Sequence, residues 1–114
     1  MSISEAFVGS HAVDTTEWSC TADSAGAAAQ TGDGVYQVFL DLQDMVEGDV
    51  LQVRIYEKVG PSSAQQIVAE WVLRGVQSTP IWVSPTLILI HGWDATLDAL
   101  AGTITVDWSI RRVA

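Results

Sequence analysis

A histidine and an aspartate stand three residues apart in the segment His91-Gly92-Trp93-Asp94. Such a pair could act as a general base and the carboxylate that orients it. On a β-strand, however, residues an odd number of positions apart point to opposite faces, so these side chains would diverge. No Gly-x-Ser-x-Gly segment or other activating context for a nucleophile is present in the sequence. We therefore predict that the protein is not an enzyme and has no catalytic residues.

Metal ligands are the next chemistry to consider. Four carboxylates gather in one short acidic segment: Asp41, Asp44, Glu47 and Asp49. Calcium prefers several oxygen ligands, but this spacing differs from that of an EF-hand loop, and Gly48 favours a solvated turn. His11, His91 and Cys20 do not have the spacing of a zinc site. We predict no bound metal and no cofactor.

The sequence contains five tryptophans. Trp71 and Trp108 fall on apolar faces at strand spacing, so we expect both in the core. Trp82 lies between two prolines and Trp93 follows a glycine, and an exposed ring there could stack on a sugar or anchor a protein interface. The alternative, that the ring folds back on the core, is equally open for Trp82 and is favoured for Trp93.

Composition excludes several classes of partner. The net charge of −9 argues against nucleic acid and anionic membranes, which bind through Lys and Arg. A single cysteine fits synthesis in a reducing cytoplasm. The N-terminal residues lack the features of a signal peptide, and the longest aliphatic run, 87–90, is too short to span a bilayer.

The elements that would position these residues follow a period of two, which is typical of strands. Segments 50–59 and 65–74 both alternate, with a turn-rich stretch between them. A hairpin centred on Ser62 would place Val53 opposite Trp71 and Ile55 opposite Ala69. The same register puts Arg54 opposite Glu70, an attractive cross-strand pair.

The C-terminal stretch 103–112 alternates in the same way. We expect it to form a hairpin with 93–99, placing Leu97 opposite Val106 and Asp94 opposite Ser109. A helical turn over 95–100 is the competing interpretation, because Ala and Leu favour helix.

The remaining segments complete an all-β chain. Strands are expected over 34–42 and 86–91, and because both are apolar on two faces, we expect each to be covered on both sides. A further strand or pair of strands is expected within 5–20, with Phe7, Val13 and Trp18 as core candidates. The prolines around 81–84 indicate an edge segment, and 21–33 reads as a long surface loop. The prediction is one domain over residues 1–114, an antiparallel β-sandwich or jelly roll of about seven or eight strands.

Such a sandwich covers only the inner face of each sheet, and several strands here are apolar on both faces. The surplus predicts an interface with another copy or another protein. The candidate interface residues are Trp82, Trp93, Val68, Val72, Ile88 and Ile90.

Several phrases of the sequence resemble small, poorly characterised proteins of tailed bacteriophages encoded near virion genes. The phrases are Asp33 to Leu42, Ile55 to Val59, His91 to Leu97 and Trp108 to Arg111. The resemblance covers most of the chain from about Glu5 onward and carries no functional residues. It implies a virion component, and at this size a capsid decoration (cement) protein, which is often a β-rich trimer at three-fold positions of the shell.

The resemblance therefore implies a homotrimer that is made in the host cytoplasm and bound to the major capsid protein on the outer surface of the virion. Packaged DNA would repel so acidic a chain, which fits an outer position. A carbohydrate-binding or tail-associated adhesin module that uses Trp82 or Trp93 is the alternative from another class. A small enzyme is the least favoured interpretation.

Overall fold

The computed structural model describes residues 2–113, which form ten strands in two antiparallel sheets. None of these residues lies in a helix, so this part of the chain holds no helix able to span a membrane. The strands are β1 (Ile3–Val13), β2 (Trp18–Ser19), β3 (Ser24–Ala25), β4 (Gly34–Asp41), β5 (Val50–Glu57), β6 (Gln66–Arg74), β7 (Ile81–Val83), β8 (Leu87–Leu89), β9 (Asp94–Ala101) and β10 (Ile104–Val113).

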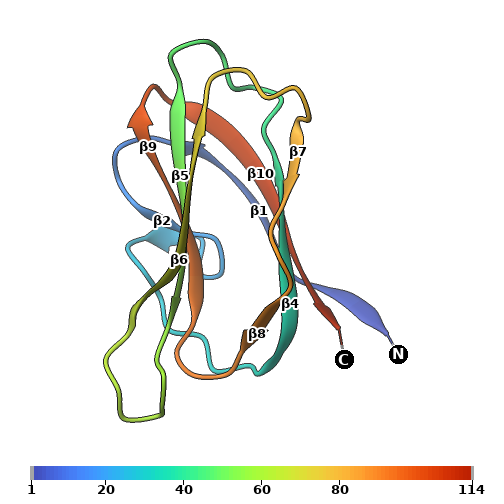
Figure 1. The fold of residues 1–114 in the computed structure, drawn as a ribbon, viewed down its shortest axis with the longest axis vertical. Coiled ribbons are helices and arrows are strands. Elements are labelled where there is room, and N and C mark those ends of the chain that lie inside the picture. Colours follow the sequence, from blue (N-terminus) through green and yellow to red (C-terminus); the bar gives the residue numbers. More distant parts are fainter. Residues whose placement is uncertain (1, 114) are drawn as a thin grey trace.

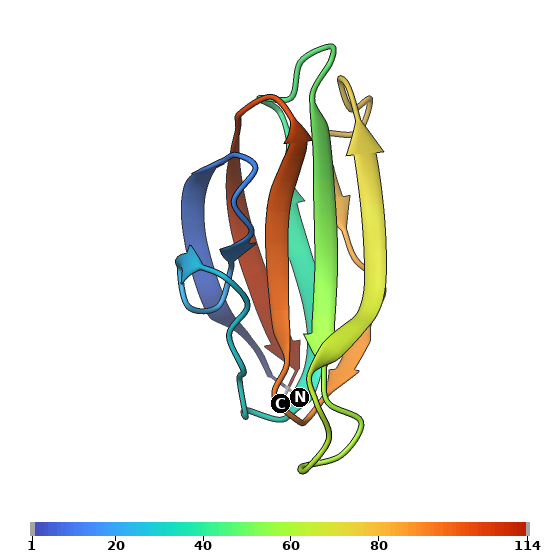
Figure 2. The same ribbon diagram turned by 90° about the vertical axis from the view of Figure 1, so that its left-hand side faces the viewer.

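The two sheets pack face to face, and Figure 1 shows them edge-on. The first sheet, here called sheet A, has the order β1-β10-β4-β7, and β8 also pairs with β4. The second, sheet B, has the order β3-β2-β9-β5-β6 and lies in front in Figure 2. β7 pairs with 39–41 and β8 with 34–36, so the two form one edge strand interrupted at Ser84-Pro85-Thr86.

This strand order is that of a jelly roll. With β7 and β8 counted as one strand, and β3 as a short addition, eight strands remain. Chain neighbours β1 and β2, β4 and β5, and β9 and β10 lie in opposite sheets, and the strands interleave as in a double Greek key. The predicted all-β class and antiparallel sandwich are confirmed, and the edge position of 81–84 is confirmed as well.

The register expected for the first hairpin is correct. β5 pairs with β6 so that Val53 lies opposite Trp71 and Arg54 opposite Glu70. The Arg54 Nε donates to a Glu70 carboxylate oxygen at 2.8 Å. Charge and alternation therefore agree on one register, as cross-strand pairing requires.

The second expected hairpin is wrong. β9 pairs with β5 and β2 in sheet B, whereas β10 pairs with β1 and β4 in sheet A. Leu97 and Val106 are both fully buried in the core between the sheets. Each strand alternates because its inner side chains face the opposite sheet, and not because the two strands pair with each other. Gly102, with φ of +82°, lies in the connection that crosses between them. The competing helical turn over 95–100 is also absent, because these residues belong to β9.

The core lies between the sheets, and aromatic pairs close its two open sides. His11 of β1 stacks on Trp18 of β2 with ring centroids 3.5 Å apart. On the opposite side, Trp71 of β6 meets Trp82 of β7 at 5.2 Å. Trp108 is buried as expected, but Trp71 is only partly buried because its strand is the edge of sheet B.

Candidate interaction surface

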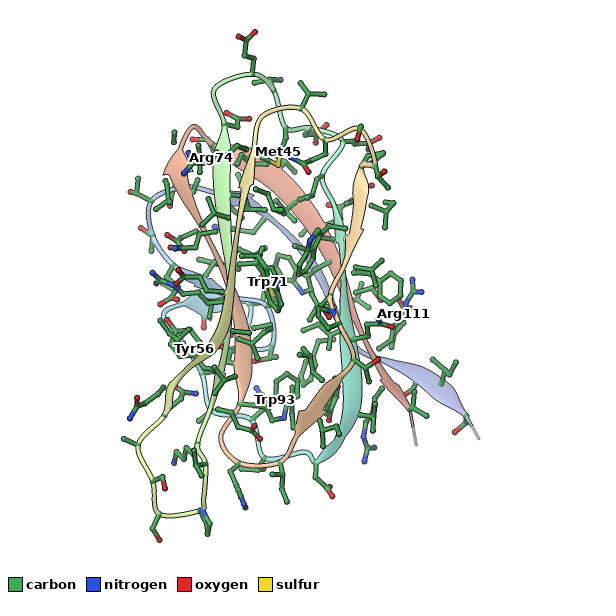
Figure 3. The ribbon with its side chains drawn as sticks, in the orientation of Figure 1. Met45, Tyr56, Trp71, Arg74, Trp93 and Arg111 are labelled. Carbon is green, nitrogen blue, oxygen red and sulfur yellow. The ribbon has the colours of Figure 1, made fainter. Side chains whose placement is uncertain are left out.

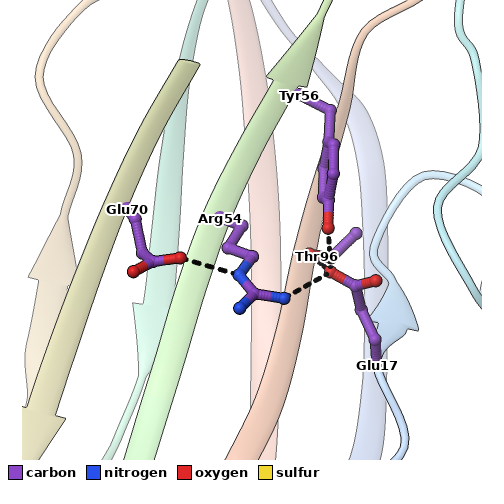
Figure 4. A network of polar contacts seen from close by, with 5 residues as sticks. All are labelled: Glu17, Arg54, Tyr56, Glu70 and Thr96. Atoms are coloured by element: carbon purple, nitrogen blue, oxygen red, sulfur yellow. Dashed lines mark hydrogen bonds and ion pairs between the residues drawn. The ribbon is translucent and has the colours of Figure 1, made fainter. Parts of the chain in front are cut away.

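The two outer faces of the sandwich differ in chemistry. A network of polar side chains crosses the outer face of sheet B (Figure 4). Arg54 lies between Glu70 and Glu17, and a Glu17 carboxylate oxygen accepts hydrogen bonds from Tyr56 at 2.5 Å and Thr96 at 2.7 Å. Burial and the bond to Glu17 raise the pKa of the Tyr56 hydroxyl. These side chains satisfy one another across the middle of this face, whereas Val72 beside them stays exposed on β6.

The segment 21–33 lies at the surface, as expected, and covers part of the same face. It is anchored by the fully buried Asp94, whose carboxylate accepts from the Thr21 hydroxyl and the Ala28 amide, both at 2.7 Å. The backbone of Gln30 pairs with that of Trp93. Asp94 therefore holds a loop, and none of its hydrogen bonds runs to His91.

Replacing Asp94 with asparagine is expected to lower the free energy of unfolding by about 1.5 kcal/mol, because one donor then loses a charged acceptor. Hydrogen exchange at the Ala28 amide should accelerate. Thermal unfolding and exchange measured by NMR test this, with exposed Asp44→Asn as the control. Any enzymatic turnover that vanished in this variant would contradict the prediction that the protein is not an enzyme.

Asp98 of β9 is buried on the same face, and its Oδ1 has no hydrogen-bond partner among the described residues. Burial raises the pKa of this carboxyl, and Arg54 acts in the opposite direction. The folded state thus binds the proton more tightly than the unfolded state, and ionisation costs stability as pH rises through the folded pKa.

Asp98→Asn is therefore expected to stabilise the protein by roughly 1 kcal/mol at neutral pH, because it removes the negative charge of a carboxylate whose ionisation is disfavoured by burial. The gain should vanish as pH falls below the unfolded pKa of about 3.9. Denaturant unfolding of both proteins across this pH range checks it. A gain independent of pH, or a loss at neutral pH, would be inconsistent with this assignment.

The outer face of sheet A is uncovered and carries many exposed apolar side chains among polar ones. Alternation along its strands places these apolar side chains outward: Ile3, Val8, Val35, Phe39, Ile81, Val83, Ile88 and Val113. Ile3 is 67% exposed, Val8 64% and Ile88 80%. A set of exposed apolar side chains of this extent on a chain of net charge −9 is the feature expected of an interaction surface. We call it the A face.

Arg111 lies at the middle of the A face and projects away from the sandwich (Figure 3). Its guanidinium covers the Phe39 ring at 3.8 Å from the centroid, a cation–π contact. This pair forms a ridge between two hollows of about 180 Å³ each. One hollow is largely apolar, with Ile3, Val35 and Val113 in its wall; the other contains Asp41 and Asp107.

The predicted interface residues do not form one surface. Trp93 is 1% exposed and donates its indole N–H to the Gly32 carbonyl at 2.9 Å, so its assignment to an interface is wrong. Trp82 points inward onto Trp71. Val68 and Val72 are exposed on β6, and Ile90 is exposed beyond β8. Ile88 alone lies on the A face.

The predicted two-sided cover of segments 34–42 and 86–91 is also not found within the chain. Tyr36, Val38 and Leu40 face the core, whereas Val35 and Phe39 face outward and are only partly buried. The short β8 is an edge strand, so its outward residue Ile88 has no neighbouring strand to shelter it.

The other candidate chemical groups have structural roles. Asp41 and Asp49 accept backbone amides of Gln43 and Val46 and so shape their turn. Residues 2–113 contain no group of three or more His, Cys, Asp or Glu able to hold a metal. Burial raises the pKa of the Cys20 thiol, which disfavours the reactive thiolate. His91 lines a separate hollow of about 330 Å³ together with Lys58.

Sequence reasoning missed Arg111, Phe39, Val8 and Ile3 as surface-forming residues. The available signal was the set of residues on the outward side of each alternating strand. In the stretch 103–112 this set contains Arg111 together with Thr105, Asp107 and Ser109. The alternation gives no sign of the contact between Arg111 and Phe39, because that contact depends on β10 pairing with β4.

Comparison with known proteins supports the fold but identifies no family. No protein-family model matches the sequence, and no curated protein matches it. Among solved structures, a mitogen of Yersinia pseudotuberculosis aligns over 99% of this chain and 86% of its own, with a TM-score of 0.53 and 8% identity. A subunit of disulfide-linked Bacillus endospore appendage pili aligns over 98% and 87%, with a TM-score of 0.54 and 15% identity. A carbohydrate-binding module from a Cellvibrio mixtus lichenase aligns at a TM-score of 0.40 and 12% identity, over 99% of this chain and 97% of its own.

Proposed function

We propose that the protein is a structural virion component, a capsid decoration (cement) protein that self-associates and stabilises a phage head by bridging capsid subunits. The observation that carries this proposal is the A face, an uncovered sheet surface on which several apolar side chains are exposed together. Exposed apolar patches of this kind mark interaction sites.

The charge supports a position on the outside of the particle. Packaged DNA is polyanionic, and a chain of net charge −9 would be repelled from it. The proposed partners are therefore other copies of the chain and the major capsid protein. Binding that favours the assembled shell over dissociated subunits stabilises the shell by mass action.

The energy for self-association would come from the A face. Burying one Val, Ile or Phe side chain contributes about 1.5–3 kcal/mol. Ile3, Val8 and Ile88, the most exposed of the set, could supply much of that energy. This mechanism needs no catalytic group.

The carbohydrate-binding alternative depended on exposed tryptophans. Trp93 and Trp108 are buried, and the other three rings are partly buried at the sides of the core. Trp93 lies in the core and Trp82 packs on Trp71, so neither tryptophan named for this alternative presents a fully exposed ring.

Particles assembled with and without the chain test the proposal. The temperature at which the particles release their DNA should be higher when the chain is present, and adding purified protein to particles that lack it should restore that temperature. Identical release temperatures, with no binding of added protein to the particles, would contradict the proposed function.

A further inference from the structure

Arg111 is a cation on the A face that forms no ion pair with a carboxylate among the described residues. Both ion pairs among the described residues belong to Arg54, although the chain contains 14 acidic residues. The Arg111 guanidinium instead lies over Phe39, and its Nε donates to the Ser109 hydroxyl at 3.3 Å. Glu5 is opposite Arg111 in the strand register, but its carboxylate accepts from Ser109.

Two carboxylates lie together in the hollow beside Arg111. Asp41 and Asp107 are directly opposite each other on β4 and β10, an arrangement in which like charges repel. Asp107 accepts from the Ser10 hydroxyl at 2.6 Å and Asp41 from the Gln43 amide, and neither pairs with a cation among residues 2–113. Arg111 also lines this hollow, but it forms no ion pair with either carboxylate among the described residues.

Arg111 and Asp107 lie at equal distances along β10 on either side of one level of the sheet. Val8, Phe39 and Val83 form an apolar band across the sheet at the level of Ser109. Arg111 lies two residues from this level in one direction, and Asp107 lies two residues from it in the other. A two-fold axis in the plane of the interface, crossing the strands at this band, would bring each Arg111 onto the other copy's Asp107.

We infer that a second copy of this chain packs face to face on the A face, with Arg111 of each copy seated between Asp41 and Asp107 of the other. The apolar bands pack on each other at the axis, and the two charge contacts are equivalent, as in an isologous dimer. This deepens the self-association in the proposed function and replaces the trimer expected from the resemblance with a two-fold pair.

The dimensions of the face are compatible with a stable pair. The strands run along the longest dimension of the molecule, 40 Å, and the sheets are as wide as its shortest, 20 Å. These dimensions bound the face at about 800 Å², and a stable interface buries about 800 Å² per partner. The pair must therefore use nearly the whole face, from Ile3 to Ile81, which is the extent of the exposed apolar residues.

Sedimentation equilibrium of the purified chain, from low micromolar to millimolar concentration, tests the inference. The unmodified chain should dimerise, and Arg111→Asp should weaken the dimer by roughly 30-fold or more, because it places three carboxylates together. Arg74→Asp is the matched control: it makes the same charge change at an exposed arginine on β6 and should leave the dimer intact. Circular dichroism and melting temperature confirm that each variant is folded.

A charge exchange makes the test specific. Asp107→Arg should also weaken the dimer, and the double variant Arg111→Asp/Asp107→Arg should restore it. A chain that stays monomeric at every concentration would overturn the inference, as would a dimer unaffected by Arg111→Asp. Either result would leave the capsid proposal standing if the chain still raises the DNA-release temperature, so the two failures are distinguishable.

Discussion

Replacing Trp108 with alanine is expected to lower the free energy of unfolding by about 3–5 kcal/mol, the range observed for truncating a buried aromatic residue. Trp108 is 2% exposed on the central strand β10, where the core side chains of both sheets meet. The loss combines the lost transfer free energy of the ring with the cavity left behind. Chemical denaturation monitored by circular dichroism measures it.

Trp108→Phe is the matched control. It retains an aromatic ring and removes an indole N–H that has no acceptor among the described residues, so it should cost clearly less than alanine. An unchanged unfolding free energy in Trp108→Ala would mean that this side chain does not belong to the core.

Gly9→Ala is expected to destabilise the protein by roughly 3 kcal/mol, the upper part of the range for overpacking. A Cβ at residue 9 would lie 2.7 Å from Cε2 of Trp108 and closer still to Cζ2. The obstacle is a rigid, buried ring and not the flexible end of a side chain. β1 must therefore pass Trp108 without a side chain at this position.

The clash predicts strong coupling between the two residues. In a Trp108→Ala background the added methyl group enters the space left by the indole, so Gly9→Ala should be close to neutral there. A double-mutant cycle of unfolding free energies measures the coupling. Additive effects of the two substitutions would be incompatible with the close approach of β1 to Trp108.

Local patterns were sufficient to predict the β5–β6 hairpin. Its strands are adjacent in the chain, and the opposite charges of Arg54 and Glu70 select the same register as the alternation of Val53 and Trp71. Fold class followed for the same reason, because period-two alternation recurs along the chain and determines which side chains must be buried.

The β9–β10 pairing could not be predicted in this way. Leu97 and Val106 alternate just as hairpin residues do, but two strands that face each other across a core show the same alternation as two that pair. The choice between these arrangements depends on β1 and β4, which pair with β10, and on β5, which pairs with β9, and all three are distant in sequence. Asp94 was misread for a related reason, since the loop that it holds lies 66 to 73 residues away.

The position of the A face could be predicted only in part. The apolar residues of 34–42 indicated that both faces of this strand are apolar, and Ile88, one of the predicted interface residues, is exposed. The ridge of Arg111 and Phe39 joins residues 72 positions apart in sequence and becomes visible only once β10 lies beside β4.

The most direct test of the structural role is the composition of purified particles. Full phage heads isolated on a density gradient should contain the chain in many copies, as measured by quantitative mass spectrometry. An impermeant amine reagent applied to intact heads should label Lys58, the single lysine of the chain, because the outer surface is open to solvent. Absence of the chain from such particles, or labelling only after the heads are opened, would contradict a decoration protein on the capsid surface.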